Sequence, residues 1–175
     1  MKDATTYRMQ CYVTELPDAA AVNARILAGF GELRDAPELE RSHYFAGRYE
    51  NIYVPEARLP ALRPVLDAAR RAAADYLGQP DLPLNVGFWL NEMGPGQVTL
   101  PHRHDEDDEL VSGVYYVRVP DNGGDLVLTR GAVTTRVTPA EGRFVFFPPD
   151  VLHEVEANRS DETRLSIGMN FGVRG

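Results

Sequence analysis

The sequence predicts a mainly β jelly roll with flanking helices, an α+β arrangement in one domain. Two observations support this prediction. The N-terminal half contains two segments with helical periodicity, whereas the chain from Leu84 onward consists of short β-type runs separated by turn residues. Many short strands at regular spacing are typical of jelly-roll barrels and sandwiches.

The length of 175 residues fits one compact domain, which we expect to span 1–175. Hydrophobic residues make up 43% and charged residues 25%, a composition that is typical of a globular protein and not of a disordered one. Residues 1–82 are expected to supply helical support and N-terminal strands. Residues 83–172 are expected to form the jelly-roll core.

Two helices are predicted in the N-terminal half. The first runs from Ala19 to Leu33, with apolar residues at helical spacing, and the preceding Pro17-Asp18 is a candidate cap. The second runs from Leu59 to Leu77 and carries a continuous apolar face. Because no linker or repeat separates them from the β half, both helices are expected to cover one face of the jelly roll.

Eight strands are predicted after the second helix, and turn sequences such as Gly94-Pro-Gly96 and Asp121-Asn-Gly-Gly124 separate them. The predicted strands are Asn85 to Asn91, Val98 to His104, Ser112 to Val119, Asp125 to Leu128, Val133 to Val137, Arg143 to Phe147, Leu152 to Glu156 and Thr163 to Phe171.

The charge balance limits the classes of partner. A formal net charge of −8 argues against nucleic acid or an anionic membrane as the main partner, because both surfaces repel an acidic protein. The first ten residues lack the apolar core of a signal peptide, and no later stretch has the length of a membrane span. The single cysteine, Cys11, has no partner for an internal disulfide. A cytoplasmic protein that acts on small molecules is expected.

Three of the four histidines lie in the β half, and their spacing predicts a metal site. Side chains two residues apart share a face of a strand, so His104 and Glu106 can point to the same side. With His153 from a distant strand they would form a facial triad of two imidazoles and one carboxylate, the ligand set of non-haem iron(II). A competing interpretation uses His102 and His104 together with an acid of the following loop.

Arg164 follows His153 on the next predicted strand, which continues with apolar residues. A guanidinium can bind a carboxylate through two parallel hydrogen bonds, so Arg164 is a candidate anchor for a dicarboxylate cosubstrate. The alternative is a surface arginine after a turn.

Four stretches together resemble the 2-oxoglutarate and iron(II)-dependent oxygenases related to prolyl hydroxylases. They are His102-Arg-His-Asp-Glu-Asp-Asp-Glu-Leu-Val-Ser-Gly-Val-Tyr-Tyr-Val117, Asn122-Gly-Gly-Asp125, Arg143-Phe-Val-Phe-Phe-Pro-Pro-Asp-Val-Leu-His-Glu-Val155 and Thr163-Arg-Leu-Ser-Ile-Gly-Met-Asn170. The resemblance covers Trp89 to Phe171, about half of the chain. It departs from the family in one respect, because the acid of the His-x-acid pair is more commonly aspartate.

The resemblance implies a double-stranded β-helix, the cupin-like form of the jelly roll, and a dioxygenase that uses iron(II), 2-oxoglutarate and O2. It maps the metal ligands onto His104, Glu106 and His153 and the cosubstrate anchor onto Arg164. It also places the Tyr116 hydroxyl beside the cosubstrate, whereas Tyr115 should point the other way. Further candidates for the site are His102, Asn91 and Ser166.

Three functional hypotheses follow. The first is hydroxylation of a small molecule or an amino-acid side chain, with the acidic run Asp105 to Glu109 as a recognition element for a cationic substrate. If the carboxylate does not bind the metal, the resemblance also allows a halide in its place, as in related halogenases. The second is a cupin-type dioxygenase or isomerase that uses a metal without 2-oxoglutarate. The third is a metal-binding or sugar-binding jelly-roll module without enzymatic activity.

Overall fold

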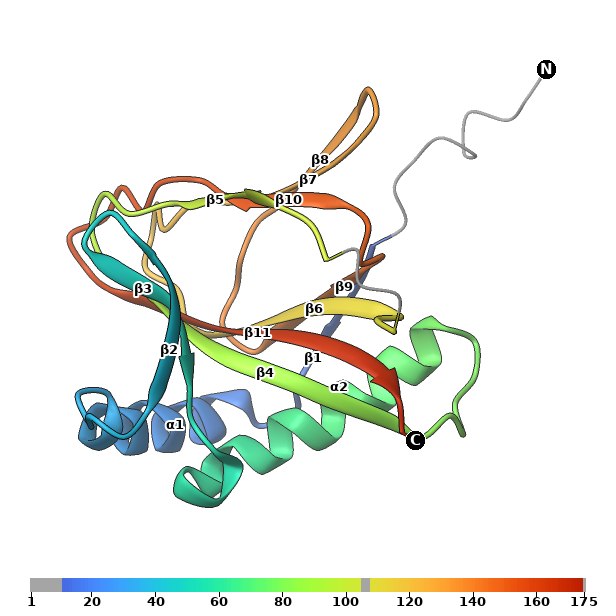
Figure 1. Cartoon of the computed structure of the whole chain (residues 1–175), viewed down its shortest axis with the longest axis horizontal. Helices are drawn as coiled ribbons and strands as arrows, with labels where there is room; N and C mark the ends of the chain where they lie inside the picture. The colour runs from blue at the N-terminus through green and yellow to red at the C-terminus, as the bar shows by residue number, and fades with distance from the viewer. Residues whose placement is uncertain (1–10, 105–107, 175) are drawn as a thin grey trace.

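A computed structural model describes residues 11–104 and 108–174. Two antiparallel sheets lie face to face, and two helices cover the outer face of the larger sheet (Figure 1). Within the described ranges, no helix is both long and apolar enough to cross a membrane.

The larger sheet has seven strands. In spatial order they are β1 (Tyr12–Glu15), β9 (Arg143–Phe147), β6 (Val111–Arg118), β11 (Arg164–Val173), β4 (Leu84–Met93), β3 (Arg48–Tyr53) and β2 (Glu40–Phe45). The long strand β11 pairs with β4 over ten residues and with β6 on its other side, so it forms the centre of the sheet.

The smaller sheet has four strands. In spatial order they are β5 (Thr99–His102), β10 (Leu152–Val155), β7 (Leu126–Arg130) and β8 (Val133–Val137). All eight strands predicted from the sequence form: β8 and β9 have the predicted bounds, and the ends of the other six differ by a few residues from the expected ones. The predicted strand that carries the histidines is shortened most, because β5 ends at His102.

The two helices match the apolar periodicity of their sequences. Helix α1 spans Ala19–Leu33, as predicted. Helix α2 spans Arg63–Tyr76, and two short 3₁₀ turns, Glu56–Arg58 and Pro60–Leu62, precede it where the sequence had suggested a longer helix. The expected cap at Asp18 is wrong: this residue adopts a left-handed conformation with φ of 57°, and its side chain makes no capping hydrogen bond.

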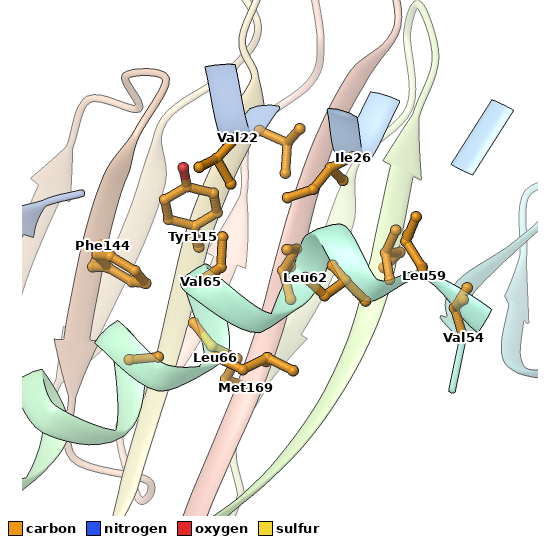
Figure 2. Close-up of a cluster of buried hydrophobic side chains, with 14 of the residues drawn as sticks. Val22, Ile26, Val54, Leu59, Leu62, Val65, Leu66, Tyr115, Phe144 and Met169 are labelled. Carbon is orange, nitrogen blue, oxygen red and sulfur yellow. The ribbon is translucent and has the colours of Figure 1, made fainter. Parts of the chain in front are cut away.

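The main core lies between the helices and the seven-stranded sheet. Figure 2 shows Leu62, Val65 and Leu66 of the α2 region packed against sheet residues that include Tyr115, Phe144 and Met169. Successive side chains of β6 point to opposite faces of the sheet, so Tyr115 faces this core while Tyr116 faces the four-stranded sheet. The sequence had predicted these opposite directions, and the structure confirms them.

Candidate active site

A cavity of about 710 Å³ lies between the two sheets. The inward faces of β4, β6 and β11 line one side, β5 and β10 line the other, and the β2–β3 hairpin contributes residues at one edge. Most of the residues that the sequence proposed for the site line this cavity: Asn91, His102, His104, Tyr116, His153, Arg164 and Ser166. Glu106, the predicted carboxylate ligand, lies outside the described residues.

Three histidines meet at one end of the cavity. His102 on β5 and His153 on β10 are directly opposed across the antiparallel pair. His104 follows two residues after His102, and its backbone N–H donates to the Pro149 carbonyl at 2.8 Å, which ties the segment after β5 to the loop before β10. One nitrogen from each imidazole lies within 4.8 Å of the other two. That spacing suits a single metal ion.

Hydrogen bonds orient two of the rings. Nδ1 of His102 lies 2.9 Å from the Leu100 carbonyl, and Nδ1 of His153 lies 3.1 Å from the Val151 carbonyl. A carbonyl can only accept, so in each neutral ring Nδ1 carries the hydrogen and Nε2 keeps its lone pair. This is the usual arrangement for a histidine that binds a metal through Nε2.

The environment keeps His153 neutral. Burial, together with the smaller effects of the neighbouring His102 and His104, lowers the pKa of His153 to about 3, against the opposing effect of the Val151 carbonyl. A neutral imidazole is the form that binds a metal, so protons do not compete for His153 near neutral pH.

His104 has a mixed environment. Its Nδ1 lies 3.5 Å from the Asn170 side-chain nitrogen and 3.9 Å from a carboxylate oxygen of Glu109. The Trp89 indole lies on another side, with ring centroids 5.9 Å apart. The sequence had included Glu109 only in the acidic run expected to recognise a cationic substrate, and it had assigned no site role to Trp89. Strand alternation could have found Trp89, because it shares a face of β4 with Asn91.

The inner part of the cavity contains Arg164 and Tyr116. Arg164 is 2% exposed, and its Nη1 donates to the Gly123 and Gly124 carbonyls at 2.8 and 2.7 Å. Its guanidinium carbon lies 5.4 Å from the centroid of the Tyr116 ring. These contacts hold the cation in place and fix its orientation within the sheet.

Tyr116 is fully buried, and among the described residues its hydroxyl makes no hydrogen bond of regular geometry, although it interacts with the Arg164 side chain. Burial raises the pKa of Tyr116 to about 12, although the positive charge of Arg164 opposes the rise. The hydroxyl therefore stays protonated. A guanidinium can only donate, so the Tyr116 O–H still lacks an acceptor, and a ligand that accepts its hydrogen bond would remove the cost of burying it.

The chain resembles known proteins in sequence and in fold. The sequence model of the 2OG-Fe(II) oxygenase superfamily matches residues 88–172. None of the curated proteins matches the chain.

Solved structures share the fold at low identity. A Pseudomonas putida prolyl-4-hydroxylase is 22% identical with a TM-score of 0.75, covering 95% of this chain and 94% of its own. The carbocyclase SnoK from nogalamycin biosynthesis is 17% identical with a TM-score of 0.75, covering 99% and 84%. The epimerase SnoN, in complex with Fe3+, alpha ketoglutarate and nogalamycin RO, is 20% identical with a TM-score of 0.69, covering 95% and 80%. These likenesses confirm the predicted double-stranded β-helix.

Proposed function

We propose that this chain, which belongs to the 2OG-Fe(II) oxygenase superfamily, hydroxylates a small molecule or an amino-acid side chain. As a member of that superfamily it is an oxidoreductase that uses iron(II), 2-oxoglutarate and O2. The observation that carries the proposal is the joint position of the three histidines and the buried Arg164 in one cavity. A metal-binding group and a carboxylate-binding group are what a chelating 2-oxo acid requires.

The metal ligands in this proposal are His102, His104 and His153. Imidazole nitrogen is a good donor for iron(II), and three such ligands leave coordination positions open for a cosubstrate. The orientation of His102 and His153 by backbone carbonyls supports the assignment. The set differs from the one expected from the His104 and Glu106 spacing, and the two sets predict different variants to lose the metal.

The cosubstrate would be held by groups on the seven-stranded sheet. Arg164 supplies the positive charge, and Tyr116 supplies a buried hydroxyl that can donate to a carboxylate. Ser166 lies two residues beyond Arg164 on the same face of β11 and lines the same cavity. Each of these groups can donate a hydrogen bond to an anion.

When bound, iron(II) with 2-oxoglutarate and O2 supplies the oxidising power to break a C–H bond. The protein contributes binding and orientation. The two sheets exclude bulk water from the inner cavity, and the walls formed by Trp89, Leu100 and the β2–β3 hairpin can hold a substrate beside the histidines. On this account no side chain acts as a nucleophile.

The first test is anaerobic titration of the apo-protein with iron(II) and 2-oxoglutarate, followed through the weak visible absorption of the chelate. The band should appear with the wild-type protein and be absent in His153→Ala. Arg164→Ala should bind iron normally but need much more 2-oxoglutarate. If iron binds and no band forms at any 2-oxoglutarate concentration, the proposal is wrong.

A second test compares the two ligand sets through metal affinity, measured by equilibrium dialysis with iron(II) under anaerobic conditions. We expect His102→Ala, His104→Ala and His153→Ala each to weaken binding by at least about a hundredfold. Glu106→Gln should leave it unchanged. His43→Ala is the control, because His43 also lines the cavity, from β2, but is not one of the three clustered histidines. Loss of the metal in Glu106→Gln with retention in His102→Ala would overturn the three-histidine set.

A further inference from the structure

Arg48 reaches from the β2–β3 hairpin to Asn91 of β4, a residue that lines the cavity. Its side chain is only 10% exposed. Nη1 donates to the Asn91 side-chain oxygen at 2.9 Å and to the Glu92 carbonyl at 3.1 Å, and Nη2 donates to the Val98 carbonyl at 3.1 Å. Arg48 therefore connects β3 to β4 and to the segment before β5. It lies outside the stretch that the superfamily model matches.

This position requires a guanidinium group. Three acceptors in different directions need a planar group with several fixed N–H donors, which a lysine ammonium cannot replace with the same geometry. A carboxylate oxygen of Glu50, 3.7 Å from Nη2, partly balances the charge. Burial lowers the pKa of Arg48, and the positive charge of Arg164 lowers it further. The two guanidinium groups are therefore close enough to interact electrostatically.

The contact with Arg48 decides which way the Asn91 amide points. Arginine has no acceptor, so the amide oxygen must face Arg48 and the amide nitrogen must face the opposite way. The nitrogen has two N–H groups, and a weak contact of 3.4 Å to the Thr99 hydroxyl occupies at most one. Asn91 lines the cavity and is the register partner of Ser166 on the neighbouring strand β11, where Arg164 lies two residues before Ser166.

We propose that Arg48 is a positioning residue for the cosubstrate: it holds the Asn91 amide so that Nδ2 donates a hydrogen bond to the 2-oxoglutarate carboxylate that Arg164 also binds. This inference rests on the proposed function. It assigns a role in cosubstrate binding to the N-terminal hairpin, which contributes no metal ligand in the proposed set. Arg48 acts through Asn91 and does not itself touch the cosubstrate.

The test is a double-mutant cycle on 2-oxoglutarate affinity, measured by anaerobic titration of the iron(II)-loaded protein. Arg48→Lys and Asn91→Ala should each raise the dissociation constant for 2-oxoglutarate about tenfold, since each removes one hydrogen bond to a charged group. The double variant should be no weaker than Asn91→Ala alone, because Arg48 acts only through that amide. Iron affinity should remain at the wild-type value in all three.

Arg34→Lys is the matched control, because Arg34 pairs with the Glu92 side chain, whereas the Asn91 amide bonds to Arg48 and Thr99. It should bind 2-oxoglutarate as the wild type does. Thermal unfolding of each variant checks that the hairpin still folds. If Arg48→Lys is unfolded, the double variant Arg48→Met with Glu50→Gln takes its place, because it removes both charges together.

Three outcomes would overturn the inference. In the first, Arg48→Lys keeps wild-type affinity, which would mean that only the positive charge matters. In the second, the two single effects multiply in the double variant. In the third, the wild-type protein binds iron but no 2-oxoglutarate, in which case the proposed function fails as well. The first two leave the proposed function intact, so the two failures are distinguishable.

Discussion

Trp89 is the only tryptophan of the chain, and its indole lies beside the histidine cluster. A paramagnetic metal ion bound to His104 would therefore quench its fluorescence. We expect cobalt(II) titration to decrease the tryptophan emission in the wild-type protein and to have little effect in His153→Ala. Unchanged emission while dialysis shows that cobalt is bound would contradict the position of the metal.

Gly168 provides the space that Trp89 occupies. The two residues are opposite each other on β11 and β4, and an added Cβ at Gly168 would lie 2.4 to 2.5 Å from three indole atoms. We predict that Gly168→Ala displaces the indole, shifts its emission wavelength, and lowers the free energy of unfolding by about 1–3 kcal/mol.

Urea unfolding measures the effect of Gly168→Ala, and Gly31→Ala is its control. Gly31 lies inside α1 with nothing within 4 Å of an added Cβ. That variant should be stabilised by roughly 0.5–1 kcal/mol, because alanine favours helix. If both variants behave alike, Gly168 has no special packing role.

The sequence predicted most of the residues that line the cavity, while its choice of Glu106 as a metal ligand stays a prediction. The spacing of His104, His153 and Arg164 was sufficient to place them together, and the structure brings all three to one cavity. The choice between His102 and Glu106 depended on strand alternation from His104 onward. That argument loses its basis because β5 ends at His102, and the end of a short strand depends on tertiary contacts such as the bond from His104 to Pro149.

At the level of elements, prediction worked where one face is apolar. Helix α1 buries a periodic set of side chains, and strands such as β6 and β9 are short apolar runs buried almost throughout, both of which the sequence displays. The β2–β3 hairpin was harder, because its exposed and half-buried residues are mostly polar. Its turn depends on positive φ values at Ala46 and Gly47, which give only a weak signal in sequence.

A buried hydrogen bond connects the first helix to the sheet. The Tyr115 hydroxyl donates to the Asn23 side-chain oxygen at 2.7 Å. We predict that Tyr115→Phe lowers the free energy of unfolding by about 1–3 kcal/mol, because it leaves the buried Asn23 oxygen without its donor. Urea unfolding tests this, and Tyr12→Phe on the exposed edge strand is a control that should change little. A loss of stability equal to that of the control would show that the bond does not contribute.

At the scale of the whole molecule, the proposed metal ligands and the proposed cosubstrate-binding residues lie on different sheets. The four-stranded sheet carries His102 and His153, and the seven-stranded sheet carries Arg164 and Tyr116. The sequence predicted the jelly roll that makes this possible, since eight alternating strands have few other ways to bury their apolar faces. It could not predict the cavity between the sheets, because its shape depends on side-chain packing between residues far apart in the chain.

Because a metal ion and 2-oxoglutarate would together connect the two sheets, both should stabilise the fold in a coupled way. A ligand at a hundred times its dissociation constant adds about 2.7 kcal/mol to the free energy of unfolding. We predict that cobalt(II) raises the midpoint temperature of unfolding and that 2-oxoglutarate raises this temperature further only when the metal is present. The His153→Ala variant should show neither increase. An equally large effect of 2-oxoglutarate on the metal-free protein would mean that the cosubstrate binds through Arg164 and Tyr116 without chelating the metal, and the two sheets would then not be joined by a shared ligand.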